Sequence, residues 1–341
     1  MTGDPWWHSE RHADRRVFLT GRNRIKRALE AWFDGEDFMP VECSALQISP
    51  GNETHLHAFA TEFRTEDGQT HPFYLHTSPE FACKKLLAAG EERIVDFARV
   101  YRNRETGPLH SPEFTMLEWY RTGVGLRAVV EDAIALCRAA QDVTKIRQFE
   151  WKGKTCDPRA DVEFITLDDA FLRYAEIDLQ SLLTERKLFA EVAADAGVPV
   201  SKDASWSDIF SAVLVSKIEP HLGDGRLTVL YRYPICEAAL AAPCADDPRY
   251  ADRFELYACG VELANGFHEL TDPVVQRARF EEDMDLKEQL YGERYPLDED
   301  FLNALEHMPN ASGVALGFDR LAMLATGAPS VHHVMWTPFT L

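Results

Sequence analysis

The segment 94–121 constrains the fold most, because it predicts two strands joined by a hairpin. The first strand ends at Arg102, a turn follows, and the second strand covers 114–121. Side chains alternate between the two faces of a strand, so Glu118 and Tyr120 share one face. A buried carboxylate such as that of Glu118 needs a partner. The partner is either an arginine from elsewhere in the chain or the ammonium group of a ligand.

Hydrophobic periodicity, caps and turn residues predict the other elements. Helices are expected over 15–33, 79–89, 128–140, much of 166–220, 274–291 and 319–325, and strands over 56–63, 73–76, 228–233, 253–257, 261–264 and 313–317. Strands joined by hairpins, with helices around them, predict an α+β fold with a largely antiparallel sheet. The order lacks the repeating βαβ unit of a Rossmann fold, and neither a G-x-G-x-x-G nor a Walker A motif is present.

Composition limits the possible partners. The net charge of −20 argues against broad nucleic-acid binding, because an acidic surface repels phosphodiester backbones. The seven cysteines are odd in number and form no C-x-x-C pair, so neither a disulfide framework nor a structural zinc site is expected. No apolar run approaches the roughly 18 residues of a membrane span, and no signal peptide is recognisable. We therefore expect a cytoplasmic protein.

Two arginines and two carboxylates stand out as a nucleotide-handling set. Arg102 closes a strand, where its guanidinium could fork across a phosphate. Arg320 opens a helix after a glycine-bearing strand, where it could stack on a purine or hold a phosphate. Each arginine, taken singly, could equally be a surface residue. Together with the two carboxylates they predict activation of a carboxylic acid with ATP.

The two carboxylates are Glu262 and Glu269, which flank Asn265-Gly266. Asn-Gly predicts a tight turn, and two carboxylates around such a turn suit magnesium held together with substrate phosphates. The alternative is a hairpin with two solvated acids.

These segments resemble a known family. The hairpin after Arg102 resembles motif 2 of the class II aminoacyl-tRNA synthetases, and 313–320 resembles motif 3. The stretches 110–120 and 262–270 are similar to lysyl-tRNA synthetase. The closest resemblance is to its paralogues that attach (R)-β-lysine to a lysine of translation elongation factor P. The resemblance implies a tail over 1–14 and a class II catalytic core over 15–341. This core contains a partly helical insertion over 142–250, and no OB anticodon-binding domain is expected.

The resemblance also implies roles for individual residues, with ATP and Mg²⁺ as cofactors. Arg102 and Arg320 are the expected catalytic residues, and Glu262 and Glu269 the expected Mg²⁺ ligands. The residues expected to bind ATP are Arg102, Asn103, Arg104, Glu105, His110, Ser111, Phe114, Glu262, Leu263, Gly317 and Arg320. The residues expected to bind the amino-acid substrate are Ser78, Pro79, Glu80, Glu118, Tyr120, Asn265, Glu269 and Ala315.

The chain departs from the family pattern at four positions. Arg104 stands where the family usually has Glu, and Ser111 where it usually has Asn. Ser44 replaces the proline of motif 1, the segment that supports the dimer in class II enzymes. Ala315 replaces the usual glycine of lysyl synthetases, and its methyl group is expected to favour a β-amino acid over α-lysine. Alternatively, Ala315 only packs the sheet.

The implied function is that of an AMP-forming ligase. It would activate (R)-β-lysine or lysine with ATP and transfer it to a lysine of elongation factor P, as a homodimer and without tRNA. Three alternatives remain open at this point: an asparagine synthetase-like amide synthesis, a free-standing lysyl-tRNA synthetase-like enzyme, and a catalytically dead regulatory paralogue.

Overall fold

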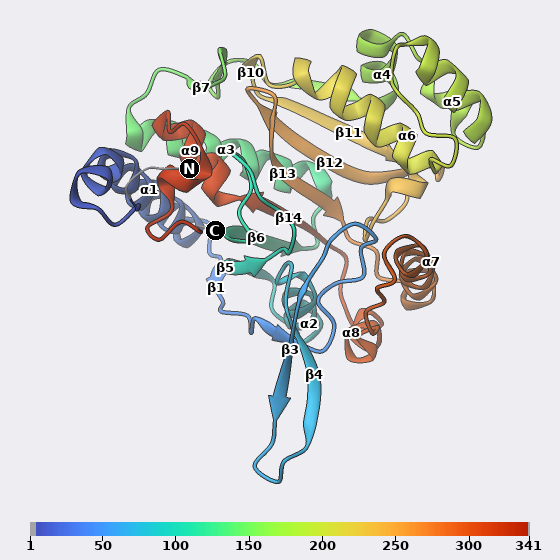
Figure 1. Cartoon of the computed structure of the whole chain (residues 1–341), viewed down its shortest axis with the longest axis horizontal. Coiled ribbons are helices and arrows are strands. Elements are labelled where there is room, and N and C mark those ends of the chain that lie inside the picture. Colours follow the sequence, from blue (N-terminus) through green and yellow to red (C-terminus); the bar gives the residue numbers. More distant parts are fainter. Residues whose placement is uncertain (1–4, 340–341) are drawn as a thin grey trace.

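One large, mostly antiparallel sheet organises the molecule, as the computed structural model of residues 5–339 shows (Figure 1). Its strands, in spatial order, are β1 (Met39–Pro40), β5 (Arg93–Tyr101), β6 (Glu113–Thr122), β14 (Ala311–Gly317), β13 (Val261–His268), β12 (Tyr250–Ala258), β11 (Thr228–Pro234) and β9 (Glu163–Thr166). Neighbouring strands are antiparallel except at the two ends, where β1 runs parallel to β5 and β9 runs parallel to β11. The sequence-based expectation of a largely antiparallel α+β fold is confirmed.

Helices cover both faces of this sheet. The helices are α1 (Ser9–Gly35), α2 (Glu80–Ala88), α3 (Leu126–Thr144), α4 (Leu167–Ala175), α5 (Arg186–Asp195), α6 (Trp206–Val213), α7 (Pro273–Tyr291), α8 (Glu299–Leu305), α9 (Phe318–Thr326) and α10 (Val331–Val334). The largest core cluster joins α1, α3 and α9 to one face of the sheet, and a second cluster joins α2, α7 and α8 to the other. No helix within residues 5–339 has the length and apolarity needed to cross a membrane.

Strand β6 divides its side chains between these two faces, as its alternation predicts. Leu117 and Trp119 are fully buried in the cluster under α1, α3 and α9, where Trp119 packs 5.7 Å from the ring of Phe33. Glu118 and Tyr120 face the opposite side, toward α2 and α8. The sheet therefore presents a carboxylate and a phenol on the side that carries the cavity described below.

The structure corrects the expected turn at Asn265-Gly266. Both residues lie inside β13, which continues to His268 rather than ending at 264. A Cβ atom on Gly266 would lie 2.4 Å from the ring of Phe254 and 2.8 Å from the carbonyl oxygen of Gly313. The glycine is therefore needed for close strand packing and not for a turn. The hairpin instead turns between β12 and β13 at Cys259 and Gly260, which both have positive φ angles.

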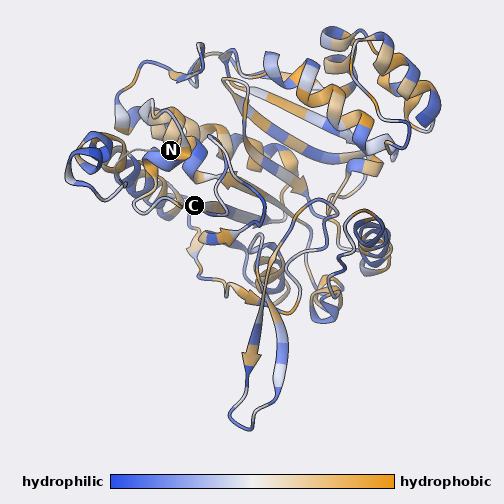
Figure 2. Ribbon diagram, in the orientation of Figure 1, coloured by the Kyte–Doolittle hydropathy of each residue, from blue (hydrophilic) through white to orange (hydrophobic). Residues whose placement is uncertain are grey.

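The stretch 142–250 contributes both to the main sheet and to a peripheral helical unit. β9 and β11 form the last two strands of the sheet, and in Figure 2 hydrophobic and hydrophilic residues alternate along β11 and β12. Helices α4, α5 and α6 enclose a hydrophobic cluster of their own. A small sheet is built from β7 (Phe149–Trp151), β8 (Lys154–Asp157) and β10 (Gly225–Arg226).

A third sheet projects away from the body of the molecule. It contains β2 (Leu46–Gln47), β3 (Phe59–Arg64) and β4 (Thr70–Leu75), and β3 and β4 form the long ribbon seen in Figure 1. The loop 48–58 lies between β2 and β3 and returns to the body beside α7. This loop matters for the site, because part of it lines the cavity.

Candidate active site

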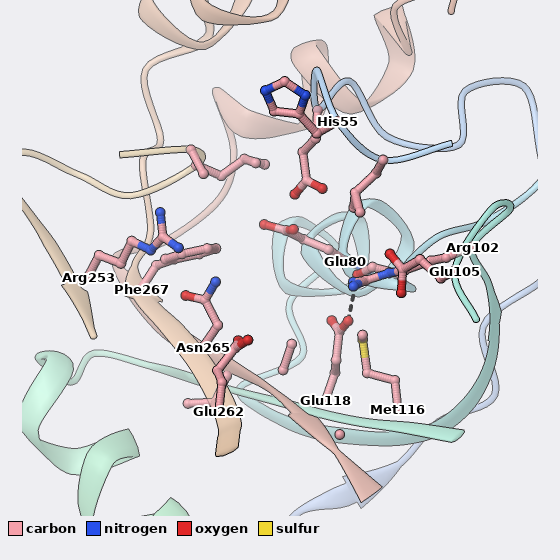
Figure 3. A pocket seen from close by; sticks show the side chains of 18 of the residues that line it. His55, Glu80, Arg102, Glu105, Met116, Glu118, Arg253, Glu262, Asn265 and Phe267 are labelled. Carbon is pink, nitrogen blue, oxygen red and sulfur yellow. Dashed lines mark hydrogen bonds between the residues drawn. The ribbon is translucent and has the colours of Figure 1, made fainter. Parts of the chain in front are cut away.

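A cavity of about 420 Å³ lies on the side of the sheet that α2 and α7 cover. Figure 3 shows residues from several distant segments converging on it. Most of the residues that the sequence predicts for binding line it: Ser78, Glu80, Arg102, Glu105, His110, Ser111, Phe114, Glu118, Tyr120, Glu262, Leu263, Asn265, Glu269, Ala315, Gly317 and Arg320. The structure does not bring Pro79, Asn103 or Arg104 into the lining. The cavity therefore unites the motif 2 hairpin, β13, β14 and the start of α9.

Arg102 and Phe114 stand together at the end of the β5–β6 hairpin. The guanidinium carbon of Arg102 lies 5.4 Å from the ring centroid of Phe114, and its Nε donates to the carbonyl oxygen of Thr77 at 3.3 Å. This bond uses one of the five N–H donors of the guanidinium. The remaining donors can form a bidentate contact with a phosphate.

Arg320 links three segments at the other end of the same region. Its Nη1 donates to the backbone oxygen of Glu262 at 2.9 Å, and its Nη2 donates to Nε2 of His110 at 2.8 Å. Burial, with a further contribution from Arg320, lowers the pKa of His110. His110 is therefore neutral at pH 7 in the absence of a ligand. A polyanionic ligand would favour its charged form.

Glu118 is the most strongly perturbed carboxyl group in the lining. It is 1 % exposed, and it accepts hydrogen bonds from Ser78 Oγ at 2.5 Å and from Tyr120 Oη at 2.8 Å. Burial, with the nearby charge of Glu80, raises the pKa of Glu118 to about 8. The two partners are hydroxyl groups and not an arginine, so within residues 5–339 this carboxyl group has no ion-pair partner. A ligand ammonium would supply one.

Lys84 contacts two of the carboxylates that are expected to bind the substrate. The sequence analysis did not identify this lysine as part of the site. Its Nζ lies 2.6 Å from Glu80 Oε1 and 2.6 Å from Glu269 Oε2, and Lys84 is 1 % exposed. Burial lowers the pKa of Lys84, but Glu269 and Glu80 together raise it above its usual value. Burial raises the pKa of Glu269 to about 7, although Lys84 opposes this rise. The helical spacing of Glu80 and Lys84 was a signal for the first contact, whereas the second depends on the tertiary fold.

The continuity of β13 bears on the expected magnesium ligands. Glu262 and Glu269 are seven residues apart along an extended chain, which separates their Cα atoms by roughly 20 Å. Glu269 has Lys84 as its cation in the ligand-free fold. Both glutamates line the cavity, and their assignment as Mg²⁺ ligands stays a prediction.

A different carboxylate lies near Glu262. Glu255, on β12, is buried, and its pKa is raised first by burial and then by the charge of Glu262. Burial and the charges of Glu255 and Glu262 also raise the pKa of Glu219, to about 7. Glu255 already has a cation, because Nη2 of Arg253 lies 2.6 Å from its Oε1, so the closeness of these acids does not by itself assign a metal site.

Arg104 faces away from the cavity. It forms an ion pair with Glu293 in the segment after α7, and its Nη1 lies 3.3 Å from Nε2 of His57. Its φ angle of 67° turns the backbone, and its N–H donates to the side-chain oxygen of Asn103 at 2.9 Å. Asn103 and Arg104 thus hold the hairpin in place, Arg104 through its contacts with His57 and Glu293. The next residue, Glu105, lines the cavity.

Several lining residues were not predicted from the sequence. They are chiefly titratable groups: Glu53, His55, Glu237, Arg253 and Asp283. Figure 3 labels two of them, His55 and Arg253. Arg253 donates to Glu255 Oε1 at 2.6 Å and to the backbone oxygen of Glu237 at 2.6 Å. These residues come from loops, from the start of a strand and from a helix, where no local pattern marks them as part of a site.

Comparison with known proteins agrees with this geometry. The family model of class II tRNA synthetases (D, K and N) matches residues 6–340. Curated proteins named elongation factor P–(R)-β-lysine ligase are similar over nearly their whole length. The one from Haemophilus ducreyi is 37% identical over 93% of this chain and 92% of its own. Those from Edwardsiella ictaluri and Yersinia enterocolitica are both 35% identical, over 93% and 94% of each chain, respectively.

The chain belongs to this ligase family, within the class II synthetases. The resemblance inferred from the motif 2 hairpin and from 313–320 is thereby confirmed. The fold class is confirmed with it.

Proposed function

We propose that the protein activates (R)-β-lysine, or lysine, with ATP as an aminoacyl-adenylate and transfers the acyl group to a lysine side chain of elongation factor P. The acceptor is inferred from the names of the relatives. The observation that carries the activation chemistry is the division of the cavity into an acidic end and an arginine-bearing end.

The acidic end supports recognition of a diamine. Glu80, Glu118 and Glu269 contribute three carboxylates, and Lys84 contributes one cation, so the set sums to −3 + 1 = −2 when fully ionised. Two ligand ammonium groups would neutralise this charge. An aspartate-activating enzyme would instead need a cation for the side-chain carboxylate of its substrate, and this group of acids argues against such a pocket.

The arginine-bearing end supports nucleotide binding. Arg102 is assigned to the α-phosphate, Phe114 and Arg320 to the two faces of the adenine, and His110 to the outer phosphates. The substrate carboxylate is already a nucleophile, so activation depends on positioning and on neutralising phosphate charge rather than on a general base. Mg²⁺, assigned to Glu262 and Glu269, would supply part of that neutralisation.

The remaining proposals concern the working state of the protein. We infer a cytoplasmic homodimer that does not charge tRNA, in line with the net charge of −20, which opposes a long polyanionic partner. The fold supports one catalytic domain over 15–341 with 142–250 inserted. The lining retains Arg102, Glu262 and Arg320 together, which disfavours a catalytically dead paralogue.

The test is an ATP–pyrophosphate exchange panel with (R)-β-lysine, α-lysine and asparagine, followed by mass spectrometry of elongation factor P. Exchange is expected with the diamines only, and the mass of elongation factor P should rise by one acyl group. Arg102→Ala should reduce exchange by on the order of 10²-fold with the fold retained. Exchange that survives in Arg102→Ala, or exchange with asparagine in place of the diamines, would overturn the proposal.

A further inference from the structure

The loop 48–58 holds one cavity-lining carboxylate in a fixed position. Lys287 of α7 is fully buried, and its Nζ donates to the backbone oxygens of Thr54 at 2.9 Å and Leu56 at 2.6 Å. Thr54 Oγ1 also donates to Asp283 Oδ1 at 2.6 Å. Glu53 precedes Thr54, so its backbone is anchored to α7 on the C-terminal side.

Glu53 differs from the other cavity-lining carboxylates in its contacts. Within residues 5–339, its carboxylate forms no hydrogen bond or ion pair with another side chain, whereas Glu80 binds Lys84 and Glu118 binds Ser78. Burial raises the pKa of Glu53 to about 6, the charges of Arg102 and Arg253 lower it, and those of Glu80 and Asp283 raise it.

Two of these charged neighbours place Glu53 relative to the proposed reaction. Arg102 is assigned to the α-phosphate and Glu80 to the substrate amino group near the carboxylate. Glu53 lines the same cavity as both residues, so its carboxylate faces the space that the acyl group and the α-phosphate would share. Glu105 also has no partner in the described chain, but its charge acts on His110 and places it at the nucleotide end.

The transfer step requires a side chain that can accept a proton from the acceptor lysine. A lysine ammonium has a pKa of about 10.4, so only roughly one molecule in 2,500 is neutral at pH 7. An amine acceptor must lose this proton before it can attack. Neither Arg102 nor Lys84 can accept it, because both are cationic, and Glu80 is already ion-paired.

We propose that Glu53 binds the ammonium group of the acceptor lysine and accepts its proton in the transfer step. The neutral amine then attacks the carbonyl carbon of the adenylate, a C–N bond forms, and the C–O bond to the phosphate breaks. AMP leaves with that electron pair, and the second proton of the amine leaves with the AMP phosphate or with water. This inference rests on the proposed function.

Separate measurement of the two half-reactions tests the assignment. Glu53→Gln keeps pyrophosphate exchange within about threefold of wild type, since activation needs no base. Single-turnover transfer from preformed adenylate to elongation factor P falls by about 10²-fold or more. Glu53→Asp recovers part of this rate. Hydroxylamine is largely uncharged at neutral pH, so its reaction with the adenylate stays near the wild-type rate in Glu53→Gln.

The matched control is Glu191→Gln. This glutamate is exposed on α5 and lies outside the cavity lining, so both half-reactions should be unchanged. Wild-type transfer rates in Glu53→Gln would overturn the assignment. So would an equal loss with hydroxylamine, which indicates positioning, or a loss of exchange, which places Glu53 in activation. Absence of exchange in the wild type would instead refute the proposed function itself.

Discussion

Glu118→Gln should remove a loss of stability that the wild-type protein shows as pH rises. The folded chain raises the pKa of Glu118 from 4.5 to about 8, so the folded state retains a proton that the unfolded state releases. Stability from this group is therefore complete below pH 4.5 and is lost progressively as pH rises to about 8. At about 1.36 kcal/mol per unit, a shift of roughly 3.5 units corresponds to about 5 kcal/mol over this range. Glutamine cannot titrate and removes this loss.

The assay is urea unfolding of the ligand-free protein at pH 5, 7 and 8.5. As pH rises, the unfolding free energy of the wild type should fall by several kcal/mol relative to that of Glu118→Gln. At pH 5 glutamine replaces a neutral acid, so the variant should lose only about 1 kcal/mol through altered hydrogen bonds to Ser78 and Tyr120.

Glu113→Gln is the matched control for this measurement. Glu113 lies on the same strand but is exposed, and its substitution should shift the unfolding free energy by less than about 0.5 kcal/mol at each pH. A parallel pH dependence of wild type and Glu118→Gln would refute the reasoning. It would mean that the carboxyl group of Glu118 is ionised, and hence neutralised by a group other than its two hydroxyl partners.

Three further outcomes are expected. Lys84→Met should cost about 3–5 kcal/mol in urea unfolding, because it leaves two buried carboxylates without their cation, whereas Lys26→Met, which breaks an exposed pair, should cost less than about 1 kcal/mol. Arg104→Ala should leave the KM for ATP within about twofold, and a larger change would place its side chain at the nucleotide. Ala315→Gly should raise the activity ratio of α-lysine to (R)-β-lysine, by up to about 1–3 kcal/mol of discrimination, and an unchanged ratio would refute a selective role.

The register of β6 and β14 gives the last of these a structural basis. Ala315 pairs with Glu118 on one side and with Asn265 on the other, and all three line the cavity. The methyl group of Ala315 therefore lies at the strand position beside Glu118, one of the carboxylates expected to bind the substrate. A neighbouring Cβ is not possible at Gly313, where it would lie 2.3 Å from Tyr120 and 2.6 Å from Glu269.

Local patterns predicted the parts of the site that follow from strand and helix periodicity. The alternation along β6 placed Glu118 and Tyr120 on one face, and the helix start at Pro79 placed Glu80 in a first turn. The sequence could not show that Gly266 lies within a strand, because an Asn-Gly pair normally favours a turn and only close contact with Phe254 explains the glycine.

Two of the residues that the sequence analysis missed are buried charged groups. Their burial also affects how the site binds a charged ligand. Lys84 and Glu255 are charges buried inside the fold, and ion pairs with Glu269 and Arg253 make their burial tolerable. The burial of a charged residue carries no periodic signal, because it depends on how the strands and helices pack. Burial raises the pKa values of Glu118 and Glu269, so both acids can be buried in their neutral form without a full set of counter-cations. A diammonium ligand then binds best after these acids ionise, and its affinity should rise with pH until about 8.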